Sequence, residues 1–292
     1  MANIIIDGIE IVASGRLLRT ARVRAEGYEC IANPAEFLKK AKAAGLKADV
    51  FTFLQELGDQ TPHHDFHCEP DCIAVMPVTT LDDWMKKQVN GKTRNMIRKA
   101  EKCGVIVKES ECDDEFVRGI ERIYNESPVR QGKPFQHYKK DFETLKKSHL
   151  TYADRCQFVG AYLEGQMIGF IKLHHGKGIS SLMQIIAMVS ARDKAPTNAL
   201  IAKAVELCAA RGVTKLHYGQ WSRRTLGEFK KHHAFERYEI PRYYAPLNTK
   251  GKVALSLRLH RKVTDRLPGK WQDYLAEQRG LYYARKYKAK AS

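Results

Sequence analysis

The stretch that decides the fold is "QFVGAYLEGQMIGFIKLHHGKGISSLMQIIAMVS", residues 157–190. Its apolar runs are separated by a Glu-Gly turn and a glycine-rich turn, which predicts consecutive antiparallel strands. "RDKAPTNALIAKAVELCAARG" follows and predicts a helix from Pro196 to Arg211, with Gly212 just beyond its end. "VTKLHYGQW" then predicts a strand parallel to the one before the helix, because a helical crossover joins the two.

A short helix over "LGEFKKHHAF" (226–235) and a last strand over "FERYEIPRYYAPL" (235–247) complete this order. Antiparallel strands followed by alternating helices and strands are typical of an α+β fold. We therefore predict a mixed sheet flanked by helices, with one point at which two neighbouring strands splay apart.

The residues on either side predict two further parts. Residues 1–22 indicate strands around turns at Gly8 and Ser14-Gly15, and "NPAEFLKKAKAAG" (33–45) indicates a helix capped by Asn33. Strands are also predicted at "ADVFTFLQEL" and "CIAVMPV", with the polar loop "GDQTPHHDFHCEPDC" between them, and one helix is predicted from Thr80 to Gly104. We predict a smaller N-terminal α/β part at 1–90, the main domain at 91–250, and a basic helical C-terminal tail at 251–292.

Composition restricts the class of protein. The chain has 292 residues, 43% of them hydrophobic and 28% charged, without an apolar run long enough to span a membrane or a secretory signal at the start. Seven mostly isolated cysteines indicate reduced thiols, so we expect a cytoplasmic protein. The net charge of +17 indicates a polyanionic partner, which is RNA, a phosphorylated substrate or an anionic membrane surface.

The strand and helix order resembles the GNAT acyltransferase fold, and more specifically its Fem (FemABX) branch of aminoacyl-tRNA-dependent peptidyltransferases. The likeness is carried by "KTRNMIRKAEKCGVIVKE" (92–109), "IYNESPVRQGKPF" (123–135) and the Phe-Lys motif in "LGEFKKHHAF" (226–235). It covers roughly residues 90–247. The resemblance implies an acyl- or aminoacyltransferase, and residues 1–90 would be a shortened second GNAT-like unit.

Two departures from the family bear on the donor. Many relatives have glycine where Ala234 stands, and the chain has no obvious helical arm for holding tRNA. An acetyl-CoA enzyme of this fold would hold the pyrophosphate on a glycine-rich loop, but "SARDKAPTNAL" (190–200) contains no glycine, and Pro196 removes one N–H donor. The expected donor is therefore aminoacyl-tRNA, with acyl-CoA as the alternative and no tightly bound cofactor.

Lys230 is the residue that we expect to act in catalysis. Amide formation needs a donor to the oxyanion that develops on the carbonyl. The resemblance places the lysine of the Phe-Lys motif at the donor or the transition state, and the backbone N–H groups around Phe229 and Lys230 would assist it. The alternative is that Lys230 and Lys231 form a solvated helix end.

Further residues are expected to bind substrate. Arg130 and Lys133, in a turn bounded by glycine and proline, would clamp a phosphate group, or else form surface charge. A phosphate backbone would suit a second basic set, which is otherwise a solvated helix face: Arg94, Arg98, Lys99 and Lys102. Aromatic residues beside the splayed strands would line a pocket or belong to the core: Tyr218, Trp221, Tyr243 and Tyr244.

A metal site is not expected. "HHDFHCEPDC" (63–72) offers histidines and a Cys–x₃–Cys pair that could bind zinc, but no second cluster lies at a distance in the sequence, and Pro70 stiffens the loop.

The sequence thus predicts an enzyme that joins an acyl or aminoacyl group to an amine. The expected acceptor is a phosphorylated small molecule or a lipid-linked cell-envelope precursor, at the inner face of the membrane. The alternatives are an acyl-CoA-dependent N-acyltransferase and a non-catalytic GNAT-like module that binds RNA or membrane. The second is favoured by the tail, which interleaves tyrosines with lysines and arginines after Gly280 and would make a peripheral membrane contact.

Overall fold

The computed structural model describes residues 4–261 and 267–288, and the chain divides into two compact units. Unit 1 contains Met1–Ile73 and Tyr238–Pro268, and unit 2 contains Ala74–Arg237 and Gly269–Ser292. This grouping differs from the sequence boundaries at residues 90 and 250. It arises because strands β5 (His67–Pro77) and β13 (Glu236–Pro246) each run from one unit into the other.

Unit 1 is a sheet with the strand order β1-β2-β3-β4-β13. Its other elements are β1 (Ile4–Ile6), β2 (Ile9–Ser14), β3 (Thr20–Val23), α1 (Pro34–Ala43), β4 (Val50–Leu54) and α8 (Thr249–Ser256). The side chain of Asn33 caps α1 as expected, by accepting a hydrogen bond from the Glu36 N–H group. A core of alternating apolar residues from these strands packs against Phe37 and Leu38 of α1.

Unit 2 is a mixed sheet with the order β5-β12-β11-β10-β9-β6. Its strands are β6 (Ile106–Ser110), β9 (Cys156–Leu163), β10 (Gln166–His175), β11 (Ile179–Ala187) and β12 (Lys215–Gln220), and β7 (Val129–Arg130) and β8 (Lys133–Pro134) form a separate hairpin. Its helices are α2 (Leu81–Asp83), the π-helix η1 (Trp84–Gln88), α3 (Gly91–Lys102), α4 (Asp114–Asn125), α5 (Phe142–Leu150), α6 (Pro196–Ala210), α7 (Arg224–His232) and α9 (Gly269–Lys288), with the short 3-10 turns η2 (Ala153–Arg155) and η3 (Arg192–Lys194).

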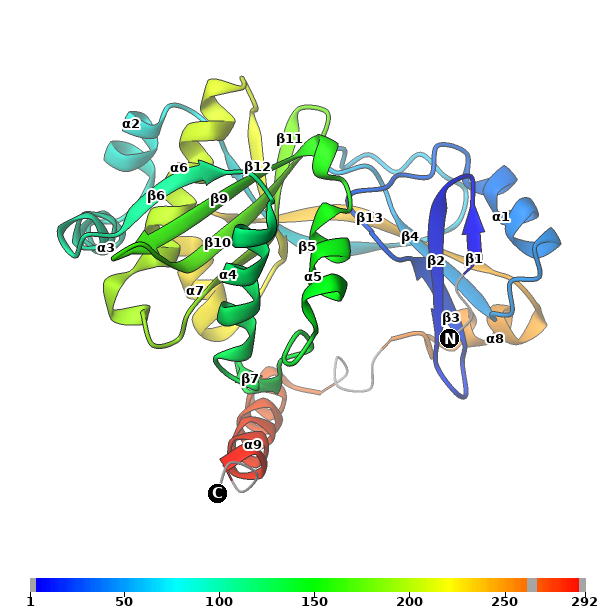
Figure 1. Ribbon diagram of the computed structural model, residues 1–292. Helices are drawn as coiled ribbons and strands as arrows, with labels where there is room; N and C mark the ends of the chain where they lie inside the picture. The colour runs from blue at the N-terminus through cyan, green and yellow to red at the C-terminus, as the bar shows by residue number, and fades with distance from the viewer. Residues whose placement is uncertain (1–3, 262–266, 289–292) are drawn as a thin grey trace. The chain divides into compact units, whose positions relative to one another are not determined.

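Helices cover both faces of this sheet (Figure 1). On one face, Ala100 of α3 and the apolar residues of α6 pack against Leu173 and Leu182 of the central strands. On the other face, α4 and α5 pack against Phe158 and Phe170. The predicted α+β class with a mixed sheet flanked by helices is confirmed. Each central strand is apolar on both sides, which explains why helices cover both faces of the sheet.

The helix predicted from Thr80 to Gly104 is interrupted. It divides into α2, η1 and α3, and Val89 and Asn90 lie outside any helix. The side chain of Asn90 accepts a hydrogen bond from the Thr93 N–H group, so that α3 has its own N-terminal cap. The Asn-Gly pair therefore starts a new helix instead of continuing the first.

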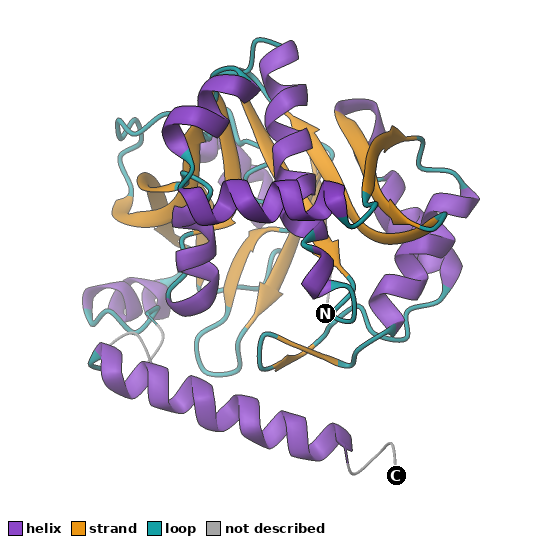
Figure 2. Ribbon diagram, turned by 90° about the vertical axis from the view of Figure 1, so that its left-hand side faces the viewer, coloured by secondary structure: helices purple, strands orange, loops and turns teal. Residues whose placement is uncertain are grey.

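The predicted C-terminal tail contains α8 and the long helix α9, which ends near the C-terminus in Figure 2. Within unit 2, α9 approaches the β7–β8 hairpin closely, because a Cβ atom placed on Gly132 would lie 3.2 Å from the Cα atom of Gly280. Among the described residues, no helix has the length and apolar character needed to span a bilayer.

Candidate active site

The point where β11 and β12 separate is the first feature of the site. These strands are paired in parallel from Ile179 and Lys215 to Ser181 and His217, but β11 continues for six more residues and β12 for three. Met183 is an extra residue in β11, since the register with β10 shifts there. A bulge bends a strand and re-aims its side chains. The carboxyl ends of β11 and β12 thus present backbone groups beyond their mutual pairing, at the place where α/β sheets bind ligands.

Lys230 of α7 lies beside the end of β12, and only 3% of its surface is exposed. Its Nζ atom donates hydrogen bonds to the backbone oxygens of Tyr218, at 2.7 Å, and Gln220, at 2.6 Å. The Ser222 hydroxyl is a third partner at 3.3 Å, and the centre of the Tyr218 ring lies 4.6 Å away. The alternative of a solvated helix end therefore does not hold for Lys230. It holds for Lys231, which is exposed.

The position of α7 explains how Lys230 reaches these carbonyl groups. Gly227 packs so closely on the preceding loop that a Cβ atom there would lie 2.1 Å from the Ser222 backbone oxygen. At the other end of α7, the Thr93 hydroxyl donates to the backbone oxygen of His232, and the Trp84 ring N–H donates to that of His233. Contacts at both ends therefore fix the helix on the sheet.

The electrostatics of Lys230 follow from its burial. Burial lowers the pKa of Lys230 to about 8, because the charged form loses its hydration. The ammonium form still predominates at pH 7. All three of its N–H donors face acceptors of the same chain, so the charge is held in one orientation. A direct bond to an oxyanion requires one of these acceptors to be exchanged.

His217 is a second polar group at this point that the sequence analysis missed. It lies on β12 opposite Ser181 of β11, with its Nδ1 atom 3.1 Å from the Ser181 hydroxyl, and it is 6% exposed. Burial, with a smaller contribution from the charge of Lys230, lowers the pKa of His217 to about 4. The imidazole is therefore neutral at physiological pH, which is the form a general base needs.

The expected aromatic residues divide between the two units. Phe229, Tyr218 and Trp221 are partly buried in the same unit as Lys230, and the Tyr218 ring packs edge-on against a buried phenylalanine. Tyr243 belongs to the core of unit 1, where its ring stacks on Phe53 and its hydroxyl donates to the Gln55 side chain at 2.6 Å. The described contacts of Tyr243 are those of a core residue, the alternative that the sequence left open.

Arg130 is bound within the chain. Its guanidinium group donates to the backbone oxygens of Ala187 and Ile123, both at 2.7 Å, and contacts the Glu126 carboxylate at 3.3 Å. Arg130 thus joins the end of β11 to the end of α4. A role in clamping substrate phosphate stays a prediction, with these donors already engaged.

Glu126 occupies the loop in which an acetyl-CoA enzyme of this fold would hold pyrophosphate. Its carboxylate accepts hydrogen bonds from the backbone N–H groups of Val189, at 2.6 Å, and Ser190, at 2.8 Å, and from the Ser190 hydroxyl at 2.5 Å. Burial raises the pKa of Glu126, but these hydrogen bonds outweigh it and hold the pKa below its usual value. A carboxylate of the chain itself therefore neutralises the start of this loop.

The remaining basic residues lie in different surroundings. Arg94 donates to the backbone oxygens of Met85 and Val89, and so stabilises the end of the π-helix. Arg98 lies exposed on α3, and Lys133 lies exposed on β8. Both remain accessible to a phosphate group.

A basic pocket of about 490 Å³ lies in unit 1. Its charged lining consists of Arg16, Arg19, Lys42, Lys47, Lys250 and Asp49. The Asp49 carboxylate already accepts from the Arg19 N–H group at 2.8 Å and contacts Lys250 at 3.2 Å. The pocket thus has an excess of positive charge suited to an anion. The sequence motifs gave no indication of it, because its residues come from separate segments.

Residues 87–231 match the family model described as the acetyltransferase (GNAT) domain. No curated protein matches the chain by sequence. The solved structures that are similar include FemX, with 10% identity, a TM-score of 0.57 and coverage of 85% of this chain and 86% of that one.

Two further similar structures carry a related name. The C-terminal domain of a putative lysylphosphatidylglycerol synthetase from Agrobacterium fabrum shares 14% identity over 88% of this chain and 86% of that one, with a TM-score of 0.55. L-PGS from Bacillus licheniformis shares 17% identity over 85% and 83%, with a TM-score of 0.54. These likenesses establish the fold, and the family model establishes the domain. The chain thus contains a GNAT acyltransferase domain, which spans residues 87–231.

Proposed function

We propose that this protein transfers an aminoacyl group from aminoacyl-tRNA to an amine, on a phosphorylated or lipid-linked acceptor of the cell envelope. The observation that carries this proposal is the buried ammonium group of Lys230 beside the separating ends of β11 and β12 in a GNAT acyltransferase domain. A fixed positive charge in a site that excludes water favours the negative charge that develops on an attacked carbonyl.

The reaction divides among the groups at this point. The amine nitrogen of the acceptor attacks the ester carbonyl of the donor, and the bond to the ribose oxygen breaks as the amide forms. Neutral His217 is suited to take the proton from the amine and to return it to the departing ribose oxygen. The positive charge of Lys230 stabilises the oxyanion. It acts either at a distance, with its bonds to the two backbone oxygens kept, or directly, after its bond to the Ser222 hydroxyl has been exchanged for one to the oxyanion. The bond to Ser222 is the longest of the three.

The choice of donor rests on Glu126. Its carboxylate already takes the N–H groups that would otherwise bind a pyrophosphate, which opposes acyl-CoA held in the usual way. The resemblance to Fem enzymes implies aminoacyl-tRNA, and a similar structure is named for lysylphosphatidylglycerol, an aminoacylated lipid. The net charge of +17 and the basic pocket of unit 1 would contribute to holding a phosphate backbone or head group.

The test compares two adjacent lysines. We expect Lys230→Ala to reduce transfer from charged tRNA to an amine acceptor by at least about a hundredfold, the size expected for losing one stabiliser of an oxyanion. Lys231→Ala is the matched control, because Lys231 is exposed and pairs with the exposed Glu228 at 2.9 Å. Radiolabelled amino acid incorporated into the acceptor measures both. Full activity of Lys230→Ala would overturn the site, and transfer from acyl-CoA alone would overturn the donor.

A second function is favoured by α9. Exposed aromatic and aliphatic residues on this helix, namely Trp271, Tyr274, Leu275, Leu281 and Tyr282, lie among lysines and arginines. Such a surface suits an RNA- or membrane-binding module without catalysis. A chain ending at residue 268 separates the two functions. An enzyme keeps its transfer to a small amine acceptor, whereas a pure binding module has no transfer to lose and gives up its salt-dependent affinity for RNA or anionic vesicles.

A further inference from the structure

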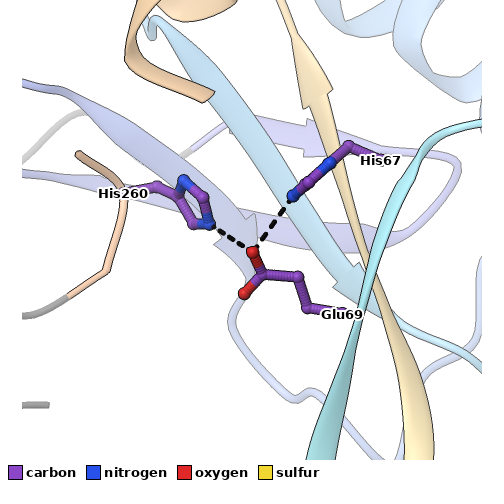
Figure 3. Close-up of side chains that lie close together, drawn as sticks. All are labelled: His67, Glu69 and His260. Atoms are coloured by element: carbon purple, nitrogen blue, oxygen red, sulfur yellow. Dashed lines mark hydrogen bonds and ion pairs between the residues drawn. The ribbon is translucent and has the colours of Figure 1, made fainter. Parts of the chain in front are cut away.

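Three side chains with metal-binding atoms meet in unit 1. His67 and Glu69 are two residues apart on β5, so they lie on the same face of the strand. His260 follows α8 and reaches the same place from a distant part of the sequence. Figure 3 shows the Nε2 atoms of both histidines directed at one oxygen of the Glu69 carboxylate.

The distances suit a small divalent metal ion. The Glu69 Oε1 atom lies 3.1 Å from Nε2 of His67 and 3.0 Å from Nε2 of His260, and all three atoms lie within 4.8 Å of one another. Tetrahedral zinc with bonds of about 2.0–2.2 Å separates its ligand atoms by roughly 3.4 Å. The two oxygen–nitrogen distances therefore need to grow by only a few tenths of an ångström to reach this separation.

The surroundings hold one ligand firmly and leave the other side open. The side chain of His260 is 1% exposed, and its ring lies 4.6 Å from the Tyr244 ring and 5.6 Å from the His67 ring, measured between centres. His67 is partly exposed, with 42% of its side chain accessible. A metal ion here would reach solvent on the His67 side, which leaves room for a fourth ligand.

Arg261 is a competing cation at the same carboxylate. Its Nη2 atom donates to Glu69 Oε1 at 2.9 Å, and its Nε atom donates to Oε2 at 3.2 Å. A divalent ion on Oε1 would have to displace the first of these bonds, while the second could remain and orient the carboxylate. Arg261 therefore opposes metal binding through its charge, and its removal gives a test that distinguishes a metal site from a simple ion-pair cluster.

We propose that His67, Glu69 and His260 form a binding site for a divalent transition metal of the zinc type. Two imidazoles and one carboxylate are a ligand set for such ions, and they lack the several oxygen ligands that Ca²⁺ or Mg²⁺ requires. The ion joins the segment that follows α8 to strand β5 within unit 1. No metal site was expected from the sequence, because ligands were sought only among residues 63–72. Neither Glu69 nor His260 was weighed there.

The experiment titrates the full-length protein with Zn²⁺ by calorimetry and with Co²⁺ by absorption. We expect one equivalent to bind, and His67→Ala, Glu69→Gln and His260→Ala each to weaken binding by about a hundredfold or more, since each removes one of three protein ligands. His63→Ala is the matched control, because His63 forms a similar pair with Asp59 at 2.6 Å on the preceding loop. Arg261→Ala is expected to bind the ion more tightly than the unmodified protein.

The absorption of bound Co²⁺ distinguishes binding at this site from binding at the nearby cysteine thiols. Cys68, next to His67 in sequence, is an exposed thiol. Bound Co²⁺ should lack the near-ultraviolet charge-transfer band of a cobalt–thiolate bond, and Cys68→Ser should bind like the unmodified protein. Unchanged binding in His67→Ala, a thiolate band, or no stoichiometric binding would each overturn the proposal. His67→Ala alters a partly exposed side chain, so the comparison does not depend on whether His260→Ala folds.

Discussion

Ala234 follows α7 with a φ angle of +66°, in the left-handed region that glycine adopts without strain. An L-residue in this conformation lowers the free energy of unfolding by about 1–2 kcal/mol through backbone strain. Glycine lowers it by about 0.4–1 kcal/mol, because it raises the conformational entropy of the unfolded chain. The balance favours glycine by a few tenths to one kcal/mol.

We therefore expect Ala234→Gly to raise the free energy of unfolding by about 0.5–1 kcal/mol. Ala210→Gly, at the exposed last residue of α6, is the matched control and should lower it, because that position is helical. Urea denaturation of both variants measures the difference. A loss of stability in Ala234→Gly would mean that the side chain contributes packing that outweighs its strain.

The residues of the site differ in how far sequence could predict them. Lys230 was accessible through a short motif, and its burial is consistent with the role given to it. His217 was not found, since a histidine inside an apolar strand has no motif of its own. It could have been found by asking which polar residue faces inward where the parallel strands separate. For Tyr243 the sequence left both a pocket and a core position open, because aromatic residues in pockets and in cores have the same sequence pattern.

At the scale of elements, α7 depends on a close backbone approach. Any side chain at Gly227 would meet the Ser222 backbone oxygen, so the helix would have to move away from the loop that Lys230 binds. We expect Gly227→Ala to lower both the melting temperature and transfer activity, because Lys230 would lose its acceptors. Glu228→Ala, on the exposed side of the same helix, should leave both nearly unchanged. Normal activity in Gly227→Ala would show that Lys230 needs no fixed position.

The elements that sequence predicted best are those with local signals. The strands within 157–190 and helix α6 follow from apolar runs bounded by glycine and proline, and their positions are confirmed. Strand β5 begins at His67, inside a segment that the sequence predicted to be a polar loop. A loop was predicted there because the first residues of the strand are polar and include Pro70. Polar edge residues do not distinguish a strand from a loop. The histidines of this segment were considered as zinc ligands, but no local pattern connects His67 to His260, which lies far along the chain.

At the scale of the whole molecule, the buried histidines determine the response to acid. Burial lowers the pKa of His149 to about 3 and the pKa values of His217 and His233 to about 4. In the unfolded chain they bind protons near the ordinary pKa of about 6.5. Between these values the unfolded state binds more protons, so the stability of unit 2 is complete above about pH 6.5 and falls as the pH drops towards 4.

Each of these histidines changes the free energy of unfolding by up to about 1.4 kcal/mol per pH unit in that range. We expect His217→Asn to reduce the slope of the unfolding free energy against pH by the contribution of about one proton. Tryptophan fluorescence during denaturation from pH 7.5 to 4.5 measures unit 2 selectively, because Trp84, Trp221 and Trp271 all belong to it. A slope that His217→Asn leaves unchanged would contradict the buried neutral form.

The division into two units could not be read from the sequence. It depends on pairs such as Leu54 with Arg242, which join β4 to β13 across most of the chain. Periodicity reports only local structure, and no local signal specifies a partner strand at that separation.

That pairing has a consequence for synthesis on the ribosome. The N-terminal strands emerge first, yet β13, which borders β4, is translated only after all of residues 74–237. Until then the nascent chain carries an incomplete sheet whose β4 edge lacks its neighbour, and such edges invite pairing with other chains. Most of unit 2 is thus inserted between the two segments of unit 1, so the sheet of unit 1 becomes complete only after this inserted part has been translated.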